Sequence, residues 1–472
     1  MQYLHVIILL CFTLAVTAMF TNNGLKQIKL RLTEGKTKLD LRNVKEKRIE
    51  QPLDQYDPHE NRTLQMRYFE NFENWKQNGP VYVYIGGEGE ENGELIASDN
   101  RSLIVQLAKD TNGAMLATEH RYYGKSLPNI TKDDKIKYFK YLSSKQALAD
   151  IAMLIMKLKS DPKFASSPVV VVGGSYAGNL AAWMRLLYAD VVDAAVASSA
   201  PVLAKKDFHE YLDTVRYTFA KYGTKNCLQN IEKVFKRIED LLKSSAGIET
   251  LKKDLNICPK NDLTKLENQQ CLFDKLYGKL KFTAQYGQVS NVKHVCGDYE
   301  PTKKLTLDLE LSLNNDTLED DNCVNVDDCW NIVDQDDIAW TYQFCTEFGY
   351  LQTTSSEKQP FVHWGPLEYW FKNCKGLVEG DIEKRIDEGV AKTNKMYGGL
   401  SPKVSKVVFP HGDMDPWHSL GVLQDLGPDA PVVMVNGTAH GDILFVRAGE
   451  PAEMKEKRKY VKELIKKWIS NQ

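Results

Sequence analysis

A short glycine-rich segment in the first half of the chain has the residues of a catalytic nucleophile. Gly173-Gly174-Ser175-Tyr176-Ala177-Gly178 follows the apolar run 168–172 and precedes 179–188, which has the apolar pattern of a helix. In a nucleophile elbow the serine occupies a sharp turn between a strand and a helix. Bulky side chains two positions to either side would clash, and here those positions hold glycine and alanine. We therefore predict that Ser175 is a nucleophile; the competing interpretation is a serine that only caps the helix.

A base that could activate this serine follows a late predicted strand. A serine hydroxyl becomes a good nucleophile when a histidine takes its proton and a carboxylate orients that histidine. In α/β-hydrolases the chain order is Ser, then Asp or Glu, then His. His440 follows the apolar segment 431–435, where the base is expected. His418 is a weaker candidate, because it follows the acid too closely to come from the next loop.

Two carboxylates compete for the acid position. Asp413 and Asp415 both follow the predicted strand 404–409. Pro416 would make the turn after Asp415 rigid, which favours Asp415. The residues alone leave both candidates open.

Backbone N–H groups near the serine are expected to form the oxyanion hole. Tyr176 directly follows the nucleophile, and Gly87 ends a Gly-Gly pair after the predicted strand 80–85. In this fold one donor comes from the residue after the nucleophile and a second from the loop after an earlier strand. The helix that begins at the elbow also points its positive end at the site.

Alternating strands and helices surround these motifs. Between residues 80 and 205 apolar strand-like runs alternate with amphipathic segments, and the pattern resumes after residue 404. Such alternation predicts a mostly parallel sheet with helices on both faces. The expected strands are 80–85, 114–118, 168–172, 194–198, 404–409 and 431–435, and the expected helices are 102–109, 145–158, 179–188 and 453–470.

The region between these two parts has a different character. It contains charged helical stretches such as 230–243 and every cysteine except Cys11. We predict a domain order of signal peptide 1–18, first part of the sheet domain 19–204, helical insertion 205–375 and second part of the sheet domain 376–472. An acidic segment around residues 320–337 fits no EF-hand spacing, so a solvated acidic loop is favoured over a calcium site.

The eight remaining cysteines predict four disulfides. They are Cys227, Cys258, Cys271, Cys296, Cys323, Cys329, Cys345 and Cys374. Their number is even and they contain no C-x-x-C pair, which argues against zinc. Eight cysteines allow 105 connectivities, so the sequence leaves the pairing open.

The N-terminus predicts entry into the secretory pathway. Residues 6–16 form an apolar run that is too short to span a bilayer, and small residues follow at 16–18. This is the pattern of a signal peptide cut after Ala18, although no Lys or Arg precedes the run. Five glycosylation sequons agree with an extracellular or lysosomal destination, at Asn61, Asn100, Asn129, Asn315 and Asn436.

Composition excludes several other classes. The 472 residues contain 61 Lys plus Arg against 63 Asp plus Glu, so no basic excess indicates a nucleic-acid partner. Hydrophobic residues make up 43%, which is ordinary for a globular protein. No later stretch is long and apolar enough for a membrane anchor. The oligomeric state stays open, with a homodimer among the options.

Several longer stretches of the chain are distinctive. One is the unbroken run Glu119-His120-Arg121-Tyr122-Tyr123-Gly124-Lys125-Ser126. Others are Trp340-Thr341-Tyr342-Gln343-Phe344-Cys345-Thr346-Glu347, the elbow, the turn 412–417, and the segments 51–54 and 84–89. Together these stretches resemble the serine exopeptidase family of lysosomal Pro-X carboxypeptidase, dipeptidyl peptidase II and thymus-specific serine protease. The stretch 345–349 is most similar to the thymus-specific branch.

The resemblance implies an α/β-hydrolase fold with a mainly helical, disulfide-stapled cap inserted in the sheet domain. It implies a triad of Ser175, Asp415 and His440, which settles Asp415 over Asp413, and a disulfide between Cys345 and Cys374. It also implies action on peptides at Pro or other small P1 residues, without metal or cofactor. Relatives often carry His or Cys after the base, whereas Gly441 follows His440 here.

The direction of attack on the peptide is a separate question. An enzyme that releases dipeptides needs a carboxylate for the substrate's free amine, and a carboxypeptidase needs a cation for the terminal carboxylate. Glu347 is a candidate amine partner, with a carboxylate paired inside the cap as the alternative. Trp183, Trp340 and Trp417 could line a proline pocket, although core packing is the default for each. Arg121 could bind a carboxylate but is better explained by pairing with Glu119 or another structural acid.

We expect dipeptide release from free N-termini, with a Pro-X carboxypeptidase as the alternative. A secreted esterase or lipase shares the elbow, but the HGGG motif of lipases is absent. A non-catalytic binding module on the same fold is the remaining alternative, and such modules typically lack a member of the triad.

Overall fold

A computed structural model describes residues 39–99, 102–299, 323–327, 329, 332–447 and 450–470. The predicted signal peptide, Asn100 and Asn315 lie outside these residues. The other three sequon asparagines, Asn61, Asn129 and Asn436, are exposed. Within the part of the chain that the structure describes, none of the helices combines the length and the apolar character needed to cross a bilayer.

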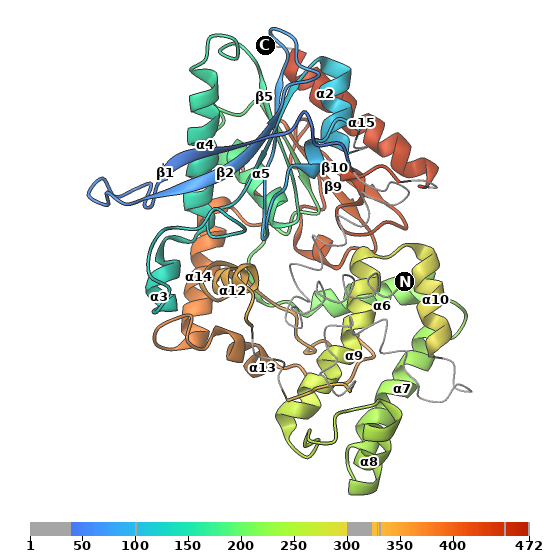
Figure 1. The fold of residues 1–472 in the computed structure, drawn as a ribbon. Helices are drawn as coiled ribbons and strands as arrows, with labels where there is room; N and C mark the ends of the chain where they lie inside the picture. Colours follow the sequence, from blue (N-terminus) through green and yellow to red (C-terminus); the bar gives the residue numbers. More distant parts are fainter. Residues whose placement is uncertain are drawn as a thin grey trace, which may run out of the picture.

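One eight-stranded mixed sheet forms the centre of the upper half of the molecule in Figure 1. Its strands lie in the order β1-β2-β4-β3-β5-β6-β9-β10. The six strands from β4 to β10 run parallel, while β2 pairs antiparallel with both β1 and β4. Their bounds are β1 Lys45–Pro52, β2 Thr63–Asn71, β3 Val81–Tyr84, β4 Ala114–Thr118, β5 Val169–Gly174, β6 Ala194–Ser198, β9 Val407–Gly412 and β10 Val432–Val435.

Four helices cover the two faces of the sheet, as the alternating pattern predicted. α2 (Leu103–Thr111) and α15 (Ala452–Ser470) pack on one face, and α4 (Ser144–Lys159) and α5 (Tyr176–Leu187) lie on the other (Figure 1). The parallel strands are buried on both faces, which explains their continuous apolar sequences. Short helical turns occur at α3 Lys135–Tyr138, η1 Glu94–Ile96, η2 Phe139–Tyr141, η6 Pro416–Leu420 and η7 Asp442–Leu444.

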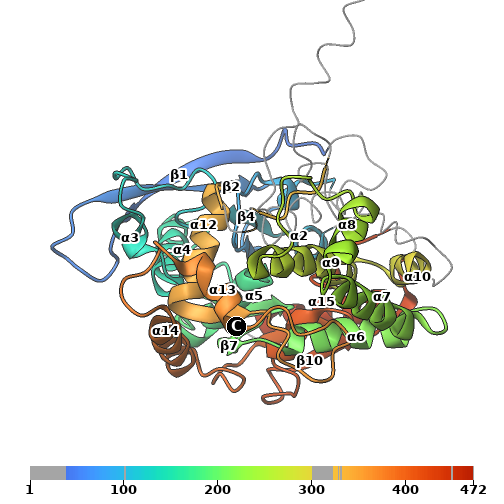
Figure 2. The same ribbon diagram turned by 90° about the horizontal axis from the view of Figure 1, so that it is seen from below.

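A mainly helical cap is inserted between β6 and β9. Figure 2 shows its helices in two groups, α6 to α10 on one side and α12 to α14 on the other. A two-stranded parallel sheet, β7 (Lys205–Asp207) with β8 (Gly349–Leu351), joins the start of the cap to its second group. The helices are α6 Glu210–Tyr222, α7 Cys227–Leu241, α8 Ser245–Asp254, α9 Leu266–Tyr286, α10 Val289–Asp298, α12 Gln335–Gln343, η4 Phe344–Phe348, α13 Leu367–Phe371, η5 Lys372–Cys374 and α14 Ile382–Tyr397. Because α14 packs against η4, this group extends beyond residue 375.

Four disulfides staple the cap, so the predicted number is confirmed. The pairs are Cys227–Cys296, Cys258–Cys323, Cys271–Cys329 and Cys345–Cys374. The last pair is the one that the family resemblance implied. It ties η4 to η5 within the second group of helices.

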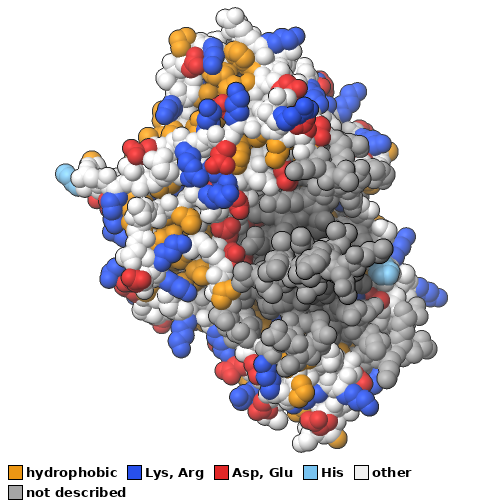
Figure 3. All heavy atoms as spheres, in the orientation of Figure 1, with side chains coloured by type: hydrophobic (Ala, Val, Ile, Leu, Met, Phe, Trp, Pro, Cys, Tyr) orange, Lys and Arg blue, Asp and Glu red, His pale blue; other side chains and the backbone are white. Residues whose placement is uncertain are grey.

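The surface carries charges of both signs. On the face shown in Figure 3, positive and negative side chains of the described residues are interspersed. In the acidic segment, Asp334 accepts hydrogen bonds from Asp336 N and Asp337 N and thereby caps α12. Among the described residues, no group of three or more His, Cys, Asp or Glu side chains has the arrangement of a metal site.

Candidate active site

Ser175 lies at a strained turn between β5 and α5. Its φ is +61°, a value that costs energy for a residue with a side chain. A Cβ added to Gly173 would lie 2.0 Å from Ala177 O, so the close approach across the turn requires glycine there. The half-buried serine therefore stands at the carboxyl end of a central strand, in the geometry of a nucleophile elbow.

His440 and Asp415 are hydrogen-bonded to each other. His440 Nδ1 lies 2.8 Å from Asp415 Oδ1, and the two side chains are 3% and 0% exposed. Because the carboxylate can only accept, Nδ1 carries the hydrogen and Nε2 keeps the lone pair that a general base uses. Burial opposes ionisation of Asp415, yet the nearby His440 holds the pKa of that carboxyl below its usual value.

The competing histidine makes a different contact. His418 Nδ1 lies 2.6 Å from the backbone oxygen of Asp415 and is not paired with the carboxylate. The imidazole that meets the Asp415 side chain is therefore that of His440.

Two adjacent serines at the end of β6 tie the elbow to the histidine loop. Ser175 N donates to Ser198 O at 2.9 Å, and Gly441 N donates to Ser199 Oγ at 2.9 Å. A Cβ added to Gly174 would also lie 2.8 Å from Leu444 Cδ1, in the turn that follows His440. The turn that carries Ser175 and the loop that carries His440 are therefore held against each other by the same strand end.

Gly441, directly after His440, has a backbone conformation that suits glycine. Its φ is +70°, which glycine adopts without strain. The hydrogen bond from Gly441 N to Ser199 Oγ also fixes the loop that carries His440.

Asp413 has a different set of partners from Asp415. Its carboxylate accepts from Tyr222 Oη at 2.6 Å, Lys221 Nζ at 2.9 Å and Gly437 N at 2.7 Å. Although burial opposes ionisation, these hydrogen bonds keep the pKa of Asp413 below its usual value. Asp413 thus joins the turn after β9 to cap helix α6 and to the loop that contains Gly437 and His440.

The loop that carries Gly87, one of the two expected oxyanion-hole residues, meets Ala177, the residue after Tyr176. A Cβ on Gly87 would be 3.5 Å from both the N and Cβ atoms of Ala177, so the loop after β3 meets the start of α5. Gly86 N, by contrast, donates to Thr118 Oγ1 at 3.2 Å. This arrangement favours Gly87 and Tyr176 as the backbone donors.

Glu347 is held inside the protein by hydrogen bonds. Its carboxylate accepts from Ser144 N at 3.0 Å, from Ser144 Oγ at 2.6 Å and from Gln343 Nε2 at 3.1 Å. Burial raises the pKa of Glu347 despite these bonds. Because Ser144 begins α4, the carboxylate also lies at the positive end of that helix. These contacts favour the structural interpretation of Glu347 over amine binding.

Trp340 and Trp417 lie beside Tyr176 and His440, respectively. The Trp340 ring centroid lies 5.3 Å from that of Tyr176, and the Trp417 centroid lies 6.4 Å from that of His440. Both indoles are buried. Their place beside Tyr176 and His440 agrees with a pocket wall, but the same contacts would serve packing alone.

Arg121 is a structural residue. Its guanidinium lies 2.6 Å from Asp150 Oδ2 and 2.7 Å from Asp150 Oδ1, and the pair is buried. Further bonds go to the backbone oxygens of Leu53 and Tyr141. Arg121 therefore pairs with Asp150, whereas Glu119 pairs with Arg67.

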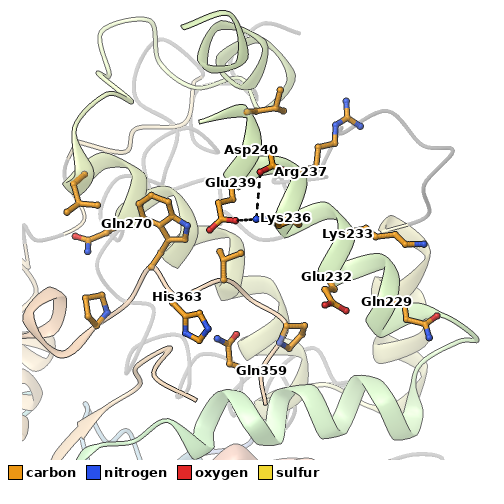
Figure 4. Close-up of a pocket in the computed structure, with 16 residues that line it drawn as sticks. Gln229, Glu232, Lys233, Lys236, Arg237, Glu239, Asp240, Gln270, Gln359 and His363 are labelled. Atoms are coloured by element: carbon orange, nitrogen blue, oxygen red, sulfur yellow. Dashed lines mark hydrogen bonds and ion pairs between the residues drawn. The ribbon is translucent and has the colours of Figure 1, made fainter. Parts of the chain in front are cut away.

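A wide groove lies elsewhere on the cap, between α7, the start of α9 and the segment 359–366 (Figure 4). Its volume is about 1300 Å³. Lys236 on its wall lies 2.5 Å from Glu239 and 3.7 Å from Asp240. The lining residues include none from the loops after β5, β9 or β10, so the groove and the site are built from different elements.

Several residues that contact the site were not predicted from the sequence. Ser199 carries no local motif, and its role depends on a contact 242 residues away. The backbone oxygen of Gln285, at the end of α9, accepts from His440 N at 2.9 Å. Gln343 lies inside a stretch that the family resemblance did include, and that stretch was the available signal.

Comparisons with known proteins agree with this geometry. The sequence signature of the family serine carboxypeptidase S28 matches residues 51–461. Thymus-specific serine protease of Mus musculus is 31% identical, over 90% of this chain and 87% of the relative. A putative serine protease of Caenorhabditis elegans, K12H4.7, is 30% identical over 90% and 88%. Lysosomal Pro-X carboxypeptidase of Bos taurus is 28% identical over 90% and 87%.

Proposed function

Because the chain belongs to the serine carboxypeptidase S28 family and is a serine-type peptidase, we propose that Ser175, Asp415 and His440 form its catalytic triad. The observation that carries this proposal is the hydrogen bond between His440 Nδ1 and Asp415 Oδ1. It fixes the tautomer that a general base requires, on a loop joined through β6 to the Ser175 turn.

The proposed reaction proceeds through an acyl-enzyme. His440 takes the proton of Ser175 as the serine oxygen attacks the scissile carbonyl, and Asp415 stabilises the imidazolium. The backbone N–H groups of Tyr176 and Gly87 bind the oxyanion. His440 then protonates the leaving amine, and a water molecule, activated by the same histidine, releases the acyl group from Ser175.

The proposed substrates are short peptides with Pro or another small residue at P1. We place dipeptide release from free N-termini first. A Pro-X carboxypeptidase is the second candidate, favoured by the family description and by relatives that carry that name. Glu347 does not distinguish the two, because Ser144 and Gln343 already bind its carboxylate.

Blocked peptides separate these two directions. A series of Pro- and Ala-containing tripeptides would be tested with free, N-acetylated and C-amidated ends, from pH 4.5 to 7.5. Loss of cleavage on acetylation alone supports dipeptide release, and loss on amidation alone supports a carboxypeptidase. Equal cleavage of peptides blocked at both ends would contradict the exopeptidase proposal.

The proposed compartment is extracellular or lysosomal. The four disulfides and three exposed sequons support passage through an oxidising, glycosylating pathway. Mass spectrometry of the protein from its source should find an N-terminus at residue 19 and glycans on some sequon asparagines. An intact N-terminus without glycans would contradict this proposal.

A further inference from the structure

The phenol of Tyr176 is anchored from two sides. Its Oη lies 2.9 Å from His120 Nε2, in the loop after β4, and 3.1 Å from Gln343 Nε2, on cap helix α12. All three side chains are buried. The residue next to the nucleophile is therefore tied both to the sheet domain and to the inserted cap.

The chemistry of the partners fixes the direction of each hydrogen bond. His120 Nδ1 lies 2.7 Å from the carbonyl oxygen of Arg121, which can only accept, so Nδ1 carries the hydrogen. Burial lowers the pKa of His120 to about 3, and the ring is neutral. Its Nε2 therefore accepts from the hydroxyl of Tyr176, and that hydroxyl in turn accepts from Gln343.

Gln343 is held in one orientation by its remaining contacts. Tyr123 Oη donates to Gln343 Oε1 at 2.6 Å, and Gln343 Nε2 donates to Glu347 Oε2 at 3.1 Å. Turning the amide around would set its oxygen against the Glu347 carboxylate. Because Ser144 holds that carboxylate at the start of α4, the amide of Gln343 is fixed relative to the sheet domain.

We propose that Gln343 is a positioning residue of the active site, which acts through the Tyr176 hydroxyl to hold the Tyr176 backbone N–H where the oxyanion forms. The hydrogen-bonded chain Ser144–Glu347–Gln343–Tyr176–His120 crosses from α4 through the cap to the residue after the nucleophile. This inference rests on the proposed function, in which Tyr176 N–H is an oxyanion donor.

A cap-borne residue can have this effect because α5 begins at Tyr176. A small rotation of that first residue would move its N–H relative to Ser175, and misplacement by about 1 Å can lower a rate a hundredfold. Trp340 and Phe348 pack on the ring and hold its position, whereas the hydroxyl bonds also fix its rotation. We therefore expect the hydroxyl bonds to affect the transition state more than substrate binding.

Each of two substitutions removes part of this hydrogen-bonded chain while keeping the packing. Gln343→Met loses every bond of the amide, whereas Tyr176→Phe loses the hydroxyl that bonds to Gln343 and His120. Gln343→Met preserves the length of the side chain, and Tyr176→Phe preserves the ring. Each should lower kcat by about tenfold with KM changed less than about twofold, which is a smaller loss than removal of an oxyanion donor itself causes. Affinity for a peptide boronate, which mimics the tetrahedral adduct, should fall in parallel with kcat.

The double variant tests whether the two residues act as one unit. If Gln343 acts through Tyr176, the kcat of the double variant should be no lower than that of the less active single variant. Asn261→Leu is the matched control, because Asn261 is also a buried amide of the cap, bonded to Val326 N and Asn325. It should lower the melting temperature without the change in kcat. If Gln343→Met does not fold, Tyr176→Phe still tests the inference, because an unchanged kcat in that variant would show that the hydroxyl does not position the Tyr176 N–H.

The outcomes separate this inference from the proposed function. An inactive wild type, or a Ser175→Ala variant that retains activity, would overturn the proposed function. If activity depends on Ser175 but both positioning variants keep kcat within twofold, the inference alone is wrong. Losses that multiply in the double variant, or a change in KM only, would also overturn it.

Discussion

His440 Nδ1 and Asp415 Oδ1 lie 2.8 Å apart, although the two residues belong to different loops and are separated by 25 positions in the chain. The same Asp415 oxygen accepts from Trp417 N at 2.9 Å, so the turn that carries the acid also fixes its side chain. The neighbouring carboxylate of Asp413 instead binds the cap. Two acids two residues apart therefore have separable tasks.

This separation predicts different losses in two matched variants. Asp415→Asn should lower kcat by about 10³- to 10⁴-fold while the protein stays folded, because the wrong histidine tautomer is then favoured. Asp413→Asn should mainly lower the free energy of unfolding, by about 1 to 3 kcal/mol, because it weakens bonds from Lys221, Tyr222 and Gly437. Steady-state kinetics and urea unfolding measure the two effects. A folded Asp413→Asn protein as inactive as Asp415→Asn would contradict the assignment.

The two serines at the end of β6 provide a second matched pair. Ser199→Ala removes the acceptor of Gly441 N and should lower kcat by about tenfold, because the His440 loop loses an anchor. Within the described residues Ser198 Oγ has no hydrogen-bond partner, so Ser198→Ala should keep both kcat and stability. Both variants would be compared by kinetics and thermal unfolding. Equal behaviour of the two would contradict the role given to Ser199.

The raised pKa of Asp336 predicts how the free energy of unfolding depends on pH. Burial raises its pKa from 3.8 to about 7, and its Oδ1 accepts from Gly124 N at 2.9 Å. Asp334, Glu119 and Glu90 face it and act in the same direction. Between about pH 4 and 7 the folded state holds a proton that the unfolded state releases, so this group makes the protein less stable as pH rises through that range.

Asp336→Asn should remove this dependence, because the amide oxygen can still accept from Gly124. The stability advantage of the variant over wild type should be larger at pH 8.5 than at pH 5, by on the order of 2 kcal/mol. Urea unfolding at the two pH values measures it. An advantage that is the same at both, or larger at pH 5, would show that Asp336 does not titrate as described.

The sequence predicted the elements whose signals are local. Five predicted apolar runs have ends within two residues of the ends of β3, β4, β5, β6 and β10, because parallel strands buried between helices are largely apolar. The elbow was recognisable since small residues, a strand and a helix must surround Ser175. The antiparallel pair β1 and β2 was missed. β1 is Lys45–Pro52, whose charged side chains are mostly exposed, so it lacked an apolar signal.

The long-range contacts of the site could not be predicted in this way. Gln343 and Tyr176 are 167 residues apart, and nothing in either local sequence indicates that their side chains meet. Glu347 illustrates the same limit, because its bond to Ser144 joins positions 203 residues apart. The sequence can identify a carboxylate such as Glu347 within a motif, but its hydrogen-bond partner depends on how the cap packs on the sheet domain.

The most direct test of the account is to identify the residue that a fluorophosphonate probe modifies. The probe would be applied to wild type and to Ser175→Ala, followed by peptide mapping and tripeptide kinetics on the same samples. The account predicts one adduct on the peptide that contains Ser175, with labelling and peptide cleavage both abolished in Ser175→Ala. Labelling at another residue, or cleavage that persists in a folded Ser175→Ala protein, would contradict it.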